Sequence, residues 1–116
     1  MKNILLILTA LFLSAPSVAA DRVIKCQVDS SDGAASYKGM CVFSPDTNGS
    51  FSLSNPVAGK PLLDGLSVVT VTLVSKGLAE VFGLTREGIN SRWGEAKRSQ
   101  TDKACWEGED FKVCAW

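Results

Sequence analysis

One short segment carries most of the residues that could bind another molecule. It reads RWGEAKR from Arg92 to Arg98, and a second tryptophan, Trp106, follows it. Arginine and tryptophan are frequent at the energetic centres of interfaces, because each combines a large contact area with polar hydrogen-bonding groups. We therefore predict a binding surface formed by Arg92, Trp93, Glu95, Lys97, Arg98 and Trp106.

A purely structural interpretation of the same residues remains open. In it, Trp93 and Trp106 pack in the core or against a disulfide, and the charged residues form an ordinary solvated face. Exposed ion pairs add only about 0 to 1 kcal/mol to stability, so charges alone argue little for function. Asp102 is expected to cap or turn the chain over 101–104 rather than to bind a ligand.

The residue types argue against catalysis. The chain has no histidine, the usual general base, which excludes Ser-His and Cys-His mechanisms. Glu80 and Glu95 form the one carboxylate pair considered, but glycosidase-type pairs need a cleft that so small a chain rarely builds. A zinc site is not expected either, because the chain has neither a histidine nor a C-x-x-C pair. We predict a non-enzymatic protein with no catalytic residue, cofactor or metal.

Residues 1–20 have the pattern of a secretory signal peptide. Lys2 precedes an apolar run over 4–13, and the small residue Ala20 ends the segment. This pattern predicts cleavage after Ala20 and a single mature domain over 21–116. The apolar run is shorter than the roughly 20 residues that cross a bilayer, although an uncleaved anchor remains the alternative. We expect the mature protein in the periplasm or outside the cell, without membrane insertion.

Four cysteines lie in the predicted mature chain. An even number in an exported chain indicates disulfides, which stabilise small domains whose cores are modest. We predict Cys26–Cys41 and Cys105–Cys114, because each pair brackets a short, turn-rich segment. Each closed loop would contribute about 2 to 3 kcal/mol by restricting the unfolded chain. A crossed pairing remains the alternative, since the first and last strands of a closed barrel often meet.

Alternating apolar residues predict a fold built of strands. The expected strands are 22–28, 37–43, 51–54, 66–74, 78–84, 89–98 and 110–116. Turn-forming residues over 44–50 link two of them, and Asn48 is interpreted as a turn residue rather than as a glycosylation site. The pattern predicts an all-β domain, a small antiparallel barrel or sandwich of about seven short strands.

For two of these segments the sequence allows more than one arrangement. In 78–84, the phase that includes Glu80 and the phase that includes Val81 both remain open as the buried face. Over 89–98, a strand with a bulge at Gly94 fits better than a helix, because glycine costs about 1 kcal/mol inside a helix.

The charge balance excludes several classes of partner. The whole chain has 12 basic and 12 acidic residues, and loss of Lys2 with the signal peptide leaves 11 against 12, a net charge of −1. This balance argues against nucleic acid, and no polybasic run points to a membrane surface. The remaining partners are a protein or a cell-envelope glycan.

The C-terminal third also resembles a known group of proteins. The run GLTREGINSRWGEAKRSQTDKACWEGEDFKVC, with a YxGxC segment at Tyr37, Gly39 and Cys41 before it, is similar to the signature of small exported proteins of alphaproteobacteria. The resemblance implies an exported, disulfide-bonded domain and brings no activity with it. A looser similarity in size, compartment and class links the chain to the periplasmic lysozyme inhibitors. Their Ser-Gly-x-x-Tyr type motif is absent here, so no residue is transferred.

The sequence therefore predicts an exported binding module. We expect it to engage a protein or cell-envelope glycan through the segment Arg92–Arg98 and the loop between Cys105 and Cys114. The alternative is an inhibitor of an envelope-directed hydrolase such as lysozyme.

Overall fold

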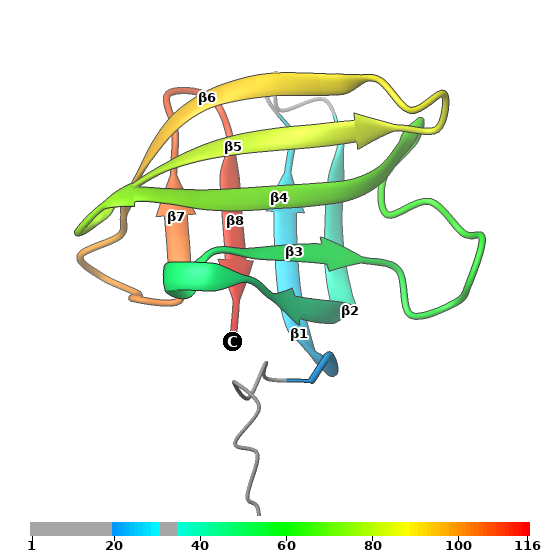
Figure 1. Cartoon of the computed structure of the whole chain (residues 1–116), viewed down its shortest axis with the longest axis horizontal. Coiled ribbons are helices and arrows are strands. Elements are labelled where there is room, and N and C mark those ends of the chain that lie inside the picture. Colours follow the sequence, from blue (N-terminus) through cyan, green and yellow to red (C-terminus); the bar gives the residue numbers. More distant parts are fainter. Residues whose placement is uncertain (1–19, 31–34) are drawn as a thin grey trace, which may run out of the picture.

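The computed structural model describes residues 20–30 and 35–116. Within these residues each strand pairs antiparallel with the next, and β8 pairs with β1, which closes a barrel (Figure 1). The strands are β1 (Arg22–Asp29), β2 (Ser36–Pro45), β3 (Phe51–Ser54), β4 (Leu66–Ser75), β5 (Leu78–Thr85), β6 (Asn90–Arg98), β7 (Cys105–Glu107) and β8 (Lys112–Ala115). The predicted signal peptide over 1–20 lies outside the described residues, apart from Ala20.

The predicted all-β class is confirmed, with one strand more than expected. The additional strand is β7, which pairs with β8 in a hairpin. Its three residues are too few to show the alternation by which a strand is recognised in a sequence.

Side chains from alternate positions of the strands fill the barrel. Figure 1 shows β4, β5 and β6 crossing in front of β1, β2, β7 and β8, and the core lies between these two layers. Its fully buried members include Val28, Leu53, Val69, Val71, Val81 and Val113. An eight-stranded barrel is about wide enough for its interior to be filled by such side chains. In β5 the buried positions are Ala79, Val81 and Gly83, so Glu80 lies on the outer face.

The strand interpretation of 89–98 is confirmed, and the helix alternative is wrong. Val81 of β5 pairs with Gly94, whereas the next residue, Phe82, pairs with Arg92. Trp93 is therefore the extra residue of a β-bulge. Gly94 has a φ of 128°, which glycine adopts without the steric cost that a side chain would add.

Both predicted disulfides are present, and the crossed pairing is excluded. Cys26–Cys41 joins β1 to β2 and belongs to the hydrophobic core. Cys105–Cys114 joins two residues that lie directly opposite each other in the β7–β8 hairpin. Two disulfides in so short a chain are typical of an oxidising compartment. In the described ranges, no helix has both the length and the apolar character needed to cross a membrane.

The two ends of the barrel are built differently. We call one the C-terminal end: it holds the start of β1, Trp116, the 3-10 turn η1 (Thr47–Gly49), the turn between β4 and β5, and the loop over 99–104 between β6 and β7. The opposite end holds the other hairpin connections, between β1 and β2, β3 and β4, β5 and β6, and β7 and β8. The expected turn at Asn48 is confirmed, since its φ of 58° is left-handed.

Candidate functional site

The residues predicted to form one binding surface lie in three different places. Arg92, Glu95 and Lys97 are exposed on the outer face of β6, whereas Trp106 is only 2% exposed, inside the barrel. The ring of Trp93 packs edge-on against Phe111, with the centroids 5.7 Å apart, at the opposite end. The structural interpretation therefore holds for the packing of both tryptophans.

A local ion pair occupies the outer face of β6. Arg92 Nη2 lies 3.0 Å from Glu80 Oε2, and Glu95 is the cross-strand partner of Glu80. The hydrogen bond from Arg92 lowers the pKa of Glu80, and the same bond raises the pKa of Arg92. Arg92 therefore balances the charge of Glu80 on the outer face of the barrel.

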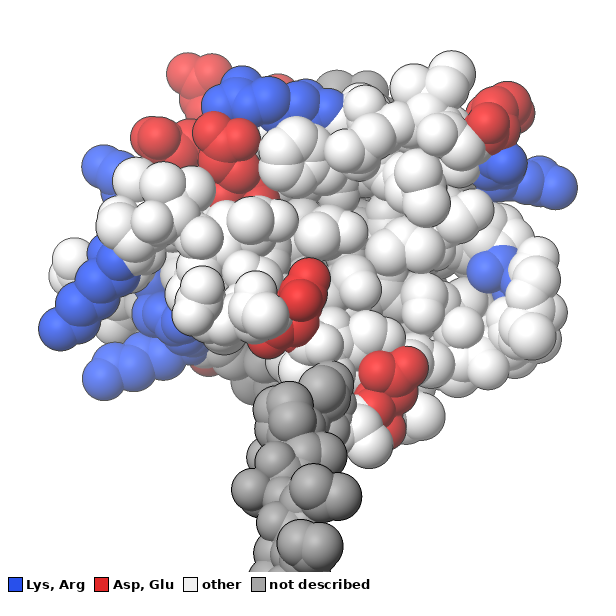
Figure 2. Space-filling model, viewed as in Figure 1, with Lys and Arg blue, Asp and Glu red and all other residues white. Residues whose placement is uncertain are grey.

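A hollow of about 210 Å³ opens at the C-terminal end of the barrel. Its wall includes three cations and four aromatic rings: Arg22, Arg98, Lys103, Phe43, Phe51, Trp106 and Trp116. The remaining lining residues are small or aliphatic, and the lining includes no aspartate or glutamate. We call this hollow the mouth. Figure 2 shows Lys and Arg side chains gathered at the lower left of the barrel, where Figure 1 places the loop between β6 and β7.

Two of the cations occupy inward-facing strand positions. Arg22 continues the series of Ile24, Cys26 and Val28 along β1, and Arg98 follows the buried Ala96 by two residues in β6. Arg22 is the first residue of β1 and Arg98 is the last residue of β6. At such a terminal position, an inward-facing arginine can reach water through the open end of the barrel. The barrel therefore places two guanidinium groups at the rim of its own interior.

Aromatic rings hold both guanidinium groups in place. The Cζ atom of Arg22 lies 4.5 Å from the ring centroid of Phe43, which stacks on Phe51. The Cζ atom of Arg98 lies 4.3 Å from the ring centroid of Trp106. A ring attracts the cation through its negative face and consumes none of the five guanidinium N–H donors. Most of these donors therefore stay available to a ligand.

The third cation, Lys103, is placed by a tightly bonded loop. Arg98 Nη1 donates to the Lys103 carbonyl oxygen at 2.6 Å. The buried Ser99 Oγ accepts from the backbone N–H groups of Thr101 and Asp102. Asp102 Oδ1 then accepts from the backbone N–H of Ala104, which confirms the predicted turn role of this aspartate. The loop presents the lysine from a fixed backbone.

Asp102 also fixes the C-terminal tryptophan. Its Oδ2 accepts a hydrogen bond of 3.0 Å from Trp116 Nε1. The bonds from Ala104 and Trp116 lower the pKa of Asp102, so the carboxylate is charged over most of the pH range. It is directed at the loop and the indole. In the part of the chain that the structure describes, no ion pair joins it to a cation of the mouth.

Sequence reasoning found two members of the mouth and missed the others. Arg98 and Trp106 were predicted as binding residues, but Arg22, Lys103 and Trp116 were not. A signal for Arg22 was available, because it falls in the inward phase of the predicted first strand. The contribution of Trp116 depends on the closure of β8 against β1, which local patterns do not reveal.

The mouth can supply positive charge, N–H donors and flat apolar surfaces. Such an arrangement can hold an anion against aromatic rings. Compared with protein-family models, with curated proteins and with solved structures, the chain shows no match.

Proposed function

We propose that the protein is an exported, non-enzymatic binding module that holds an anionic cell-envelope glycan in the mouth. The observation that carries this proposal is the set of three cations around a ring-lined hollow whose wall includes no aspartate or glutamate. Planar guanidinium groups match the geometry of a carboxylate and can bind it through two parallel hydrogen bonds. The ring faces suit the C–H faces of a sugar, because the face of an aromatic ring carries partial negative charge.

A binding titration tests the proposal. The full chain is expressed with its own leader, recovered from the periplasm and titrated calorimetrically with polygalacturonate, a linear polymer with one carboxylate on each sugar. We expect binding to this polymer and none to neutral dextran. The variant Arg22→Gln, Arg98→Gln, Lys103→Gln should bind about 100-fold more weakly, if each cation contributes roughly 1 kcal/mol.

The matched control removes the same charge elsewhere. Lys60→Gln, Arg86→Gln, Lys112→Gln neutralises three cations at the opposite end of the barrel and should bind like the wild type. Equal loss of affinity in both triple variants would show that overall charge, rather than the mouth, attracts the polymer. Absence of any binding to acidic polysaccharides would reject the proposal.

A second candidate is inhibition of an envelope-directed hydrolase such as lysozyme. The observation in its favour is the fixed loop that presents Lys103 beside Arg98, because glycosidases place paired carboxylates in their clefts. The purified protein should then slow peptidoglycan lysis, and Lys103→Gln should lose this effect. Unchanged lysis by several lysozymes at micromolar excess of protein would end this candidate.

A further inference from the structure

Trp116 belongs to two hollows at once. It lines the mouth, and it also lines a second hollow of about 250 Å³ on the outer face of β1 and β2. The other residues of this second hollow are Lys25, Cys26, Lys38, Gly39 and Met40. We call it the outer hollow. The indole is therefore the wall that the two hollows share.

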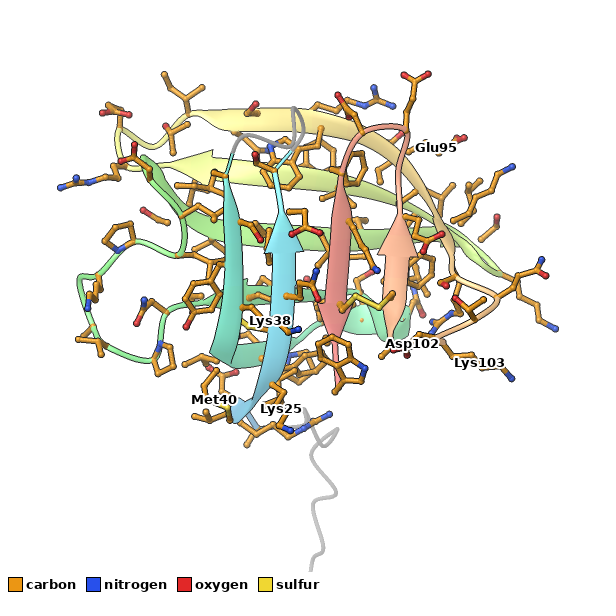
Figure 3. All side chains as sticks on the ribbon, turned by 180° about the vertical axis from the view of Figure 1, so that it is seen from behind. Lys25, Lys38, Met40, Glu95, Asp102 and Lys103 are labelled. Carbon is orange, nitrogen blue, oxygen red and sulfur yellow. A yellow bond between two sulfur atoms is a disulfide. The ribbon has the colours of Figure 1, made fainter. Side chains whose placement is uncertain are left out.

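The outer hollow repeats the chemistry of the mouth. It carries two cations, Lys25 and Lys38, and its lining includes no aspartate or glutamate. Neither lysine forms an ion pair within the described ranges. Met40, which is 44% exposed, is the cross-strand partner of Lys25 and adds an apolar surface between the charges. Figure 3 shows these three side chains along β1 and β2, with Lys103 across the C-terminal end.

The shared indole is held in position from two sides. Trp116 Nε1 donates to Asp102, and the backbone N–H of Trp116 donates to the Lys25 carbonyl oxygen at 3.0 Å. The side chain is nevertheless 47% exposed, a large fraction for a tryptophan. An aromatic ring that is both fixed and exposed loses little conformational entropy when a ligand stacks on it.

We propose that a single ligand runs from the mouth across Trp116 into the outer hollow, and that it is a linear polyanionic glycan. This inference rests on the proposed function and deepens it. Cations lie on both sides of the indole, three in the mouth and two in the outer hollow. A single small anion would use only one group of them. A chain with a charge on each sugar would use both groups and stack a ring on the indole between them.

The barrel favours a glycan over an extended acidic peptide. Peptides commonly bind by adding a strand to the free edge of a sheet. Here β1, the strand beside Trp116, pairs with β2 on one side, and on the other side it pairs with β8 from Cys26 to Asp29 and bonds to Trp116 through the Lys25 carbonyl oxygen. A peptide lying along β1 would therefore have to bind through its side chains, whereas a sugar ring can stack directly on Trp116.

Chain length provides the test. Galacturonic acid oligomers from the monomer to the octamer are titrated into the wild-type protein. Affinity should rise with length until one oligomer spans both hollows, and should then level off. In the variant Lys25→Gln, Lys38→Gln we expect the monomer to bind as before and the octamer to bind about tenfold more weakly.

The controls separate this inference from the proposed function. Lys60→Gln, Lys112→Gln removes the same charge at the opposite end and should leave the dependence on length unchanged. Arg98→Gln should weaken binding at every length. If Arg98→Gln has this effect but Lys25→Gln, Lys38→Gln has none, the extended path is wrong and the mouth proposal survives. If Arg98→Gln has no effect, the proposed function itself fails.

Two further probes test the class of ligand. Poly-glutamate and vesicles containing phosphatidylglycerol are titrated into the same variants. We expect both to bind more weakly than the galacturonate octamer. Equal or tighter binding of either probe, with the same dependence on Lys25 and Lys38, would overturn the assignment to a glycan.

Discussion

Two hollows near the two ends of the β7–β8 hairpin carry opposite charge. The mouth has three cations in its wall, whereas the hollow at the turn of the hairpin is lined by Asp29, Glu107, Glu109, Asp110 and a single cation, Lys112. The whole chain has equal numbers of basic and acidic residues, so its net charge conceals this separation. An even net charge gives no reason to expect nucleic acid as a partner, and it says nothing about an anion site that a few residues build.

The ends also differ in packing. At the opposite end, a Cβ atom on Gly108 would lie 2.1 Å from Phe111 Cε1, and one on Gly83 would lie 2.9 Å from Trp93 Nε1. The rings of Phe111 and Trp93 pack there against Gly108 and Gly83, and they fill this end of the barrel interior. At the C-terminal end, the rings lie below the rim and leave a hollow above them. The rings at the opposite end are therefore tightly packed against backbone, whereas the rings of the mouth border an open hollow.

The largest predicted effect comes from reversing the charge at each end. Arg22→Glu, Arg98→Glu, Lys103→Glu should reduce polygalacturonate affinity by more than about 100-fold, because attraction becomes repulsion. Glu107→Lys, Glu109→Lys, Asp110→Lys should change it by no more than about threefold, since screening weakens charges that lie a barrel length away. Titration calorimetry at physiological ionic strength measures both.

Combining the six substitutions sharpens the comparison. The combined variant has a cationic hollow at the opposite end, but Phe111 is the single ring in the lining of that hollow, and it is buried and packed on Trp93. This variant should not recover binding. Recovery would mean that charge alone makes the site and that the rings of the mouth are dispensable.

The second prediction concerns the packing of Phe111 on Gly108. Gly108→Ala should destabilise the protein by about 1 to 3 kcal/mol, because the added methyl group overlaps the ring of Phe111. For a domain of this size, each kcal/mol lowers the melting temperature by about 4 to 8 °C. Polygalacturonate affinity of the folded protein should stay unchanged. Thermal unfolding followed by circular dichroism gives the first value and titration gives the second.

Replacing the Phe111 ring by a smaller aliphatic side chain provides the control for this packing contact. In a Phe111→Leu background, Gly108→Ala should cost less than in the wild type, because the overlapping ring is gone. Equal costs in the two backgrounds would mean that the ring contact does not limit packing at this end.

The third prediction contrasts the exposed tryptophan with the packed one. Trp116→Ala should weaken polygalacturonate binding by about tenfold and cost at most about 1 kcal/mol of stability, because the indole is 47% exposed. Trp93→Ala should do the reverse, lowering the melting temperature and leaving affinity unchanged, because Trp93 packs on Phe111. Loss of affinity in Trp93→Ala, measured where the variant is fully folded, would contradict the division of roles between the ends.

Local patterns were enough to predict most of the fold. The alternation in β1 and the β-branched run in β4 identify strands because each spans several periods. The bulge at Gly94 was also predictable, since a glycine inside a strand often marks one. Both disulfides follow from short spacing, because their partners lie in adjacent hairpin strands.

The mouth could be predicted only in part, for a physical reason. Its residues come from β1, β2, β3, β6, β7 and β8, from two connections and from Trp116 after β8, and they meet only when the barrel closes. Arg98 and Trp106 were predicted from their residue types alone. The bulge then separates Arg98 from its sequence neighbours Arg92 and Trp93, because one extra residue changes which side of the strand faces inward. A contiguous segment of sequence therefore contributes to three surfaces.

The smallest predicted effect is a pH dependence at the C-terminal end. The folded-state pKa of Asp102 is lowered by the bonds from Ala104 and Trp116. Above the ordinary aspartate value of about 3.9, the carboxylate is charged in both the folded and the unfolded chain, and its contribution to stability is fully present. As the pH falls below that value, the unfolded chain takes up a proton first, and the contribution is lost as the pH falls through the lowered pKa.

The variant Asp102→Asn isolates this contribution. Its melting temperature should lie slightly below that of the wild type at pH about 6, and the difference should shrink towards pH about 3. Glu80→Gln is the matched control, because the pKa of Glu80 is lowered as well, by Arg92 on the outer face of the barrel. Only Asp102→Asn should also weaken polygalacturonate binding at neutral pH, since only Asp102 holds Trp116 in place. A pH-independent difference for Asp102→Asn would show that its hydrogen bonds act without the charge, and unchanged binding would show that Trp116 needs no anchor.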